Sequence, residues 1–226
     1  MTRAEIRNSI KAALNPARPG VTSQTVRWTD FEINSHIDDG YIDLAEKTGA
    51  VVETVQLSAP GGQHFLDLPD QCLFPIAATD VASGLPIDFC HWSLIDGHDT
   101  TWIRRQSSRP ELMAAWGLYS VLLYPAYQAA GTIELTMAVV PSGLASDGSE
   151  PDLPDEYHQA LVHWGHAQCL LKGADERRFG RALRQLGYYG DVAVGLGSWA
   201  GERHQGILQA IYGEALRVPS PILEGS

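Results

Sequence analysis

Hydrophobic positions in the first 50 residues recur with the period of an α-helix. Ile6 and Ile10 share one face of a predicted helix over residues 2–14, and Thr2 with Glu5 has the spacing of a capping box. A second predicted helix begins at Thr29, where Glu32 repeats that spacing, and Gly49 is a typical end. Its apolar stripe is expected to contain Phe31, Ile33, Ile37, Tyr41 and Leu44.

The pattern then changes to short runs typical of β-strands. Strands are expected near residues 51–57, 64–68, 73–81, 87–94, 118–124 and 132–140, with turn signals such as Pro60-Gly61-Gly62 between them. Six short strands with few helical patterns between them favour an antiparallel sandwich or barrel.

After a Ser-, Gly- and Pro-rich loop at 141–154 the helical period returns. Residues 155–172 are apolar on more than one side, which predicts a helix buried from several directions. A further helix is expected over 175–186 with Phe179, Leu183 and Leu186 inward, and another over 199–216. Residues 187–197 fit either a kinked continuation or a loop.

These elements predict an α+β chain in which a helical bundle from both chain ends carries an inserted antiparallel β-sandwich or barrel-like domain. The expected boundaries are 1–50 and 151–216 for the bundle, 51–150 for the insert and 217–226 for an extended C-terminal tail.

Composition narrows the functional classes. The 226 residues carry a net charge of -11, and residues 49–150 hold 3 basic against 11 acidic side chains, so sequence-specific nucleic-acid binding by this segment is not expected. Three scattered cysteines indicate no disulfide framework, and no apolar run is long enough to span a membrane. Because Thr2, Arg3 and Glu5 follow Met1 on a helical pattern, no signal peptide is expected.

No catalytic motif is complete. Ser198 has Leu196 and Ala200 where a nucleophile elbow needs glycines, and the glycines at 195, 197 and 201 miss the dinucleotide spacing. His163 and His166 could share a metal on one helix, but no carboxylate follows at ligand spacing, so core or interface histidines are the favoured interpretation. Asp96-Gly97-His98-Asp99 fits a turn between strands better than a calcium loop. The sequence therefore predicts no enzyme, no metal and no cofactor.

Charged and aromatic side chains suggest surfaces for association. Three arginines at i, i+4 and i+7 either form a solvated face or meet acidic groups of a neighbouring chain, where arginine forks suit carboxylates. The candidate subunit-interface residues are Trp164, Arg177, Arg181, Arg184, Asp38, Asp39 and Asp43. The other tryptophans, among them Trp92, Trp102 and Trp116, fit core or interface packing better than sugar platforms.

Several motifs, in this order, resemble those of the head–tail adaptor (connector) proteins of tailed bacteriophages. They are Trp28-Thr29-Asp30, Phe65-Leu66-Asp67-Leu68-Pro69-Asp70, Leu123-Tyr124-Pro125, Val139-Val140-Pro141 and Leu153-Pro154-Asp155-Glu156-Tyr157, which together span about residues 28–175. Two features depart from the family pattern. Glycines at 187, 190, 195, 197 and 201 interrupt what is usually a long charged helix, and the insertion from Pro86 to Met113 has no assigned counterpart.

The resemblance implies a structural virion protein that forms a twelve-fold homo-oligomeric ring beneath the portal, joins the capsid to the tail or nozzle protein, and continues the DNA channel without sequence-specific binding. Its expected location is the head–tail interface of the virion, with no membrane partner. The tail residues expected to dock on the portal are Val218, Pro219, Ser220, Pro221, Ile222 and Leu223. Two alternatives stay open: another tail or head-completion subunit, or a β-sandwich carbohydrate-binding module.

Overall fold

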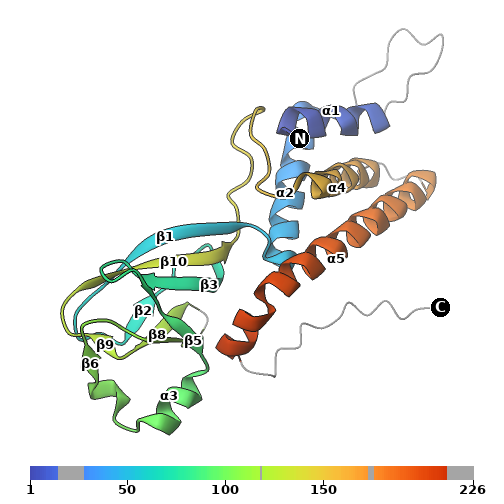
Figure 1. The fold of residues 1–226 in the computed structure, drawn as a ribbon. Helices are drawn as coiled ribbons and strands as arrows, with labels where there is room; N and C mark the ends of the chain where they lie inside the picture. Colours follow the sequence, from blue (N-terminus) through green and yellow to red (C-terminus); the bar gives the residue numbers. More distant parts are fainter. Residues whose placement is uncertain (15–27, 118, 173–175, 213–226) are drawn as a thin grey trace, which may run out of the picture. The chain divides into compact units, whose positions relative to one another are not determined.

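The computed structural model describes residues 1–14, 28–117, 119–172 and 176–212, with backbone only for residues 176–177 and 198–212 (Figure 1). The expected α+β class is confirmed. The described helices are α1 (Arg3–Leu14), α2 (Asp30–Thr48), α3 (Trp92–His98), α4 (His158–Leu171) and α5 (Glu176–Tyr212), with short 3-10 turns at Trp102–Arg104 and Asp155–Tyr157.

The chain divides into two compact units. One contains Met1–Val51 and Val140–Ala200 and is helical, and the other is built on Val52–Val139 and holds the strands. The sequence-based domain boundaries, and the assembly of both chain ends into one bundle, stay predictions. The expected tail at 217–226 lies outside the described residues.

In the helical unit, α1, α2 and α4 pack against one another in all three pairs. Both predicted capping boxes are present: Thr29 with Glu32 opens α2, and Thr2 with Glu5 precedes α1. Gly49 ends α2 in the left-handed conformation, with φ 61°, where a β-carbon would be strained. The expectation that α4 is buried from several sides is confirmed, because its buried residues include the neighbours Ala160, Leu161 and Val162, which point in different directions around the helix.

Close helix approach in this unit depends on two glycines. A β-carbon at Gly40 of α2 would lie 2.5 Å from Cδ1 of Trp164 in α4, and one at Gly165 would lie 2.5 Å from Cδ1 of Ile10 in α1. Neither position has room for a side chain, so these two glycines set how closely α4 lies to its neighbours.

The β unit holds two four-stranded sheets and a two-stranded pair, and it is not a closed barrel. The first sheet has the order β1-β10-β3-β4 and is antiparallel; the second has the order β2-β8-β7-β5, in which β5 and β7 are parallel. The strands are β1 (Val52–Ala59), β2 (Phe65–Asp67), β3 (Cys72–Asp80), β4 (Leu85–Pro86), β5 (Asp88–Cys90), β6 (Gln106–Ser107), β7 (Leu112–Ala115), β8 (Ser120–Tyr124), β9 (Ala126–Tyr127) and β10 (Gly131–Val139).

The expected antiparallel pairing is found in most strand pairs, but β5–β7 and β6–β9 pair in parallel. The predicted strand over 87–94 is also too long: it ends at Cys90, and α3 begins at Trp92. His91 caps α3 by accepting from the backbone N–H of Ser93 through Nδ1, 3.3 Å away. This cap starts a helix where the apolar run alone suggests a strand.

Helix α5 is continuous from Glu176 to Tyr212, so no loop interrupts residues 187–197 (Figure 1). The glycines that looked like a departure from the adaptor pattern therefore lie inside a long helix. Three inward assignments are wrong: Phe179 and Leu183 of α5 are exposed, and so is Phe31 of α2. Ala182, Tyr189 and Leu196 form the buried side of α5 instead.

Candidate assembly surfaces

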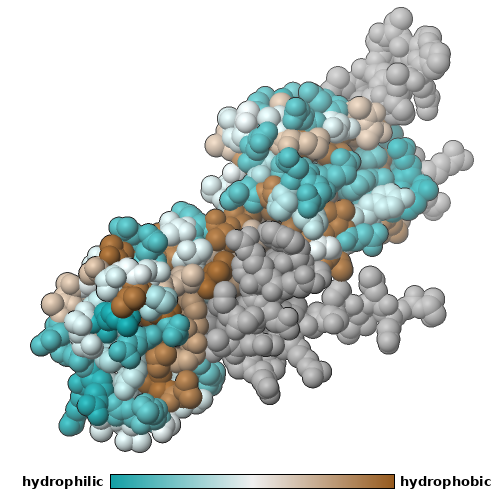
Figure 2. Space-filling view, viewed as in Figure 1, coloured by the Kyte–Doolittle hydropathy of each residue, from teal (hydrophilic) through white to brown (hydrophobic). Residues whose placement is uncertain are grey.

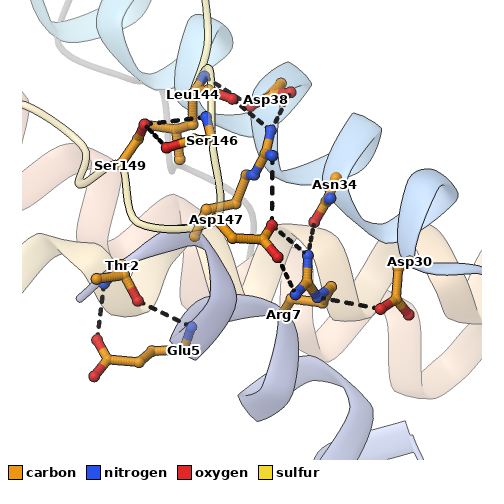
Figure 3. A network of polar contacts seen from close by, with 11 residues as sticks. Thr2, Glu5, Arg7, Asp30, Asn34, Asp38, Leu144, Ser146, Asp147 and Ser149 are labelled. Carbon is orange, nitrogen blue, oxygen red and sulfur yellow. Dashed lines mark hydrogen bonds and ion pairs between the residues drawn. The ribbon is translucent and has the colours of Figure 1, made fainter.

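A polar clasp fixes the loop at 140–154 to the first two helices (Figure 3). Arg7 of α1 donates two hydrogen bonds to the carboxylate of Asp147, 2.7 and 2.8 Å long, and a third to Asn34 of α2. The hydrogen bonds from Arg7 lower the pKa of Asp147 to about 2. A bidentate pair of this kind fixes orientation as well as distance, so the loop is held in one position.

Asp38 completes the clasp from α2. Its carboxylate accepts the backbone N–H of Leu144 at 2.9 Å, while Arg3 donates to the carbonyl oxygen of Leu144 and lies 4.0 Å from the Asp38 carboxylate (Figure 3). The structure thus gives this candidate interface residue a partner within its own chain.

The other two candidate aspartates, Asp43 and Asp39, differ in their partners and in their exposure to solvent. Asp43 accepts hydrogen bonds from Lys47 at 2.7 Å and from the Tyr189 hydroxyl of α5 at 2.5 Å, so it too is used inside the subunit. Burial, followed by the bond to Asp43, raises the pKa of Tyr189. Asp39 is exposed and lies 4.0 Å from His36, and it is the member of this group that solvent reaches most freely.

Of the three candidate arginines, Arg181 and Arg184 lie exposed on α5, whereas the side chain of Arg177 is outside the described residues. Among the described residues no ion pair joins Arg181 or Arg184 to the acidic side chains of α2. The two charged rows are on separate helices of one unit. Arg181, Arg184 and Asp39 face solvent, whereas Asp38 and Asp43 have partners in their own chain.

Trp164 lies between helices of its own chain. Its indole covers Gly40 of α2 and meets the ring of Tyr189 of α5, with centroids 4.9 Å apart. It is half-buried, so part of its surface stays available. Its position joins α2, α4 and α5.

The histidines of α4 have packing roles. His163 Nδ1 lies 2.8 Å from Oε1 of Gln185, and His166 is buried, which lowers its pKa. No group of three His, Cys, Asp or Glu side chains in the described part of the chain is arranged to hold a metal. The expected turn at residues 96–99 is instead the end of α3, where Asp99 is the C-terminal cap residue. No described helix is long and apolar enough to cross a membrane.

An aromatic cluster lies at the surface of the β unit. Trp116 contacts Phe65, Trp92 and Trp102, with ring centroids 5.2, 6.2 and 6.3 Å apart, and Phe65 also meets Trp102 at 6.3 Å. The structure thus brings together three tryptophans that are separate in the sequence. Phe65, Trp92 and Trp116 are exposed. Hydrophobic residues, coloured brown, reach the surface at several places in Figure 2.

The sequence pattern did not predict that one apolar face of α5 is exposed. Phe179, Leu183, Gly187, Gly190 and Val194 follow one another at i, i+4, i+8, i+11 and i+15, so they share one side of the helix. Phe179 is 55% exposed, Leu183 51% and Val194 45%. A β-carbon at Gly187 or Gly190 would meet no atom within 4 Å. Each glycine costs about 1 kcal/mol of helix stability relative to alanine, with no packing inside the described chain to explain it.

The exposed features described above are charged side chains, aromatic rings and a helix face. A family model described as SU10 adaptor protein matches residues 1–204. The chain belongs to this family of phage head–tail adaptor proteins, and the expected resemblance is confirmed. No curated protein matches the chain. It is a structural virion component that acts through other virion proteins, and such families are not typically enzymatic.

Proposed function

We propose that the protein forms a closed homo-oligomeric ring at the head–tail interface, docked beneath the portal, and that twelve copies surround the channel through which DNA passes. The helical segments of both chain ends form the body of the ring in this proposal. The tail or nozzle protein binds on the side opposite the portal.

The observation that carries the proposal is the separation of opposite charges on two helices of one unit. Arg181 and Arg184 lie exposed on α5, and Asp39 lies exposed on α2. Two different, complementary faces on one subunit support a head-to-tail contact, and such contacts close into a ring when the rotation between copies is right. Arg177, Asp38 and Asp43 are assigned to the edges of this contact, with Trp164 behind it.

The overall charge of -11 agrees with a DNA channel. Lysine and arginine rows bind phosphates and would slow a passing duplex, whereas an acidic wall does not retain it. The C-terminal segment, Val218 to Leu223, is proposed as the part that docks on the portal.

Imaging of intact particles tests the proposal. Density for this chain as a ring between portal and tail is the expected result, and the number of copies follows from the symmetry of that ring. Virions that lack the chain, or that carry it elsewhere, would contradict the proposal.

A second candidate rests on the aromatic cluster. Exposed Trp92 and Trp116, joined through Trp102 and Phe65, offer rings on which a sugar can stack, as in a carbohydrate-binding tail or head-completion subunit. Glycan binding by the purified protein that is lost in Trp92→Ala would favour this candidate. Glycan binding that Trp92→Ala leaves unchanged, or no binding, would remove it.

A further inference from the structure

The exposed face of α5 is a hydrophobic row with a gap at its centre. Phe179 and Leu183 stand on one side of Gly187 and Gly190, and Val194 stands on the other. The two glycines leave the helix backbone uncovered, since nothing lies within 4 Å of the places where their β-carbons would be. Glycine at such a position is useful when another chain approaches the backbone closely.

Helix α2 carries the complementary feature. Phe31 is 82% exposed, although its ring is among the largest apolar side chains of the helix. Phe31, Ser35, Asp39, Ile42 and Glu46 repeat the same i, i+4, i+8, i+11, i+15 spacing along the outer side of α2. The exposed row on α2 begins with an aromatic side chain. The row on α5 has an open gap at its two central glycines, which an aromatic side chain can fill.

The two rows are also bordered by charged side chains. Arg184 is exposed and lies three residues before Gly187, and Asp191 is exposed and lies four residues after it, so a cation and a carboxylate both border the glycine gap. Asp39 and Glu46 are exposed in the row that follows Phe31. A helix bearing these carboxylates can lie against the α5 face on the side of Arg184 and pair with it.

We infer that the glycine-lined face of α5 receives the Phe31 face of α2 from a second copy of this chain. The contact is heterologous, because it joins different helices of the two copies, and it therefore leaves one unused α2 face and one unused α5 face for further copies. This inference rests on the proposed function only in requiring that copies of the chain lie next to one another.

The test uses the full-length protein and sedimentation equilibrium over a wide concentration range. Association in the range between about 1 μM and 1 mM is expected for the wild-type chain. Replacing both glycines, Gly187→Ala with Gly190→Ala, should weaken association at least tenfold. It should also raise the melting temperature of the monomer by about 2–4 °C for each substitution, because the new methyl groups enter open space and alanine favours the helix.

Gly195→Ala is the matched control. It lies on the same helix but off this face, and its β-carbon would make ordinary contact with Tyr157 at 3.8 Å. Its melting temperature should rise in the same way while association stays unchanged. Higher stability with weaker association distinguishes a lost interface from a damaged fold.

Mixing two defective variants tests the heterologous geometry. Phe31→Ala keeps the α5 face, and the double glycine variant keeps Phe31, so each associates poorly alone. Together they should form a 1:1 dimer with close to wild-type affinity and no larger species, because only one productive contact is possible.

Three results would overturn the inference. They are a wild-type chain that stays monomeric at about 1 mM, a Phe31→Ala chain that associates normally, and variants that do not complement on mixing. Particle images distinguish this inference from the proposed function. A ring whose subunits meet through other faces would contradict the inference alone. A protein that dimerises through these faces in solution but is absent from virions would contradict the proposed function alone.

Discussion

Arg7 and Asp147 are 140 residues apart in the sequence and are joined by two hydrogen bonds of 2.7 and 2.8 Å. The pair fixes the loop that leads into α4 against α1 and α2 (Figure 3). Arg7 holds the pKa of Asp147 at about 2, below its ordinary value of 3.8, so folding stabilises the charged form of this carboxylate.

Stability from the Arg7–Asp147 pair should therefore be fully present above about pH 4 and should be lost as the pH falls from about 4 to about 2. Asp147→Asn keeps the size of the side chain but cannot titrate. Its melting temperature should be lower than that of the wild-type protein at pH 7, and the difference should shrink at pH 2. Thermal unfolding followed by circular dichroism measures this, and a difference that is constant with pH would contradict it.

Gly40→Ala should destabilise the protein by about 1–3 kcal/mol, because the new methyl group would lie 2.5 Å from the Trp164 indole and force α2 and α4 apart. Urea unfolding measures the change. Gly148→Ala, where nothing lies within 4 Å, is the control and should change stability little. Equal effects at the two positions would show that the close approach of Trp164 does not limit position 40.

Tyr127→Phe should cost about 1–3 kcal/mol, because Asp80 would lose the hydroxyl that donates to it at 2.5 Å in a buried site. The hydrogen bonds from Ser83 and Tyr127 outweigh burial and lower the pKa of Asp80, so the carboxylate is charged and needs its donors. Tyr119→Phe, at an exposed tyrosine, is the control. Unchanged urea unfolding of Tyr127→Phe would show that water replaces the lost donor.

Arg181→Glu should prevent ring formation on portal-bearing particles if the arginine row of α5 meets acidic groups of a neighbouring copy, since two like charges would then face each other. Ring occupancy counted by electron microscopy measures the effect. Tyr188→Gln, also exposed on α5, is a control that leaves the charges unchanged. Full occupancy with the charge-reversed chain would exclude Arg181 from the interface.

Deletion of residues 217–226 should abolish attachment of the protein to portal particles while leaving its fold intact. Co-sedimentation with purified portal measures attachment, and circular dichroism checks the fold. A chain in which these ten positions are replaced by a Gly/Ser segment of equal length is the control for length alone, and it should fail to attach too. Unchanged attachment after deletion would remove the tail from the proposed docking site.

The sequence by itself determined the features that depend on near neighbours in the chain. Thr29 with Glu32 and Gly49 set both ends of α2, and turn signals such as Pro60-Gly61-Gly62 separate the strands, because capping and turn formation involve residues a few positions apart. The ordered motifs between residues 28 and 175 were sufficient to indicate the adaptor family.

Only the tertiary structure decided which sides of the helices are covered. Phe31, Phe179 and Leu183 fit an inward stripe by spacing, yet the covered side of a helix depends on which elements pack against it, and these three stay exposed. Local sequence also favours a break at Gly187 and Gly190, whereas α5 continues through them. The pairings of Arg7 with Asp147 and of Trp164 with Gly40 cross more than 100 residues, and a contact of that range depends on the folded arrangement of the helices rather than on any local pattern.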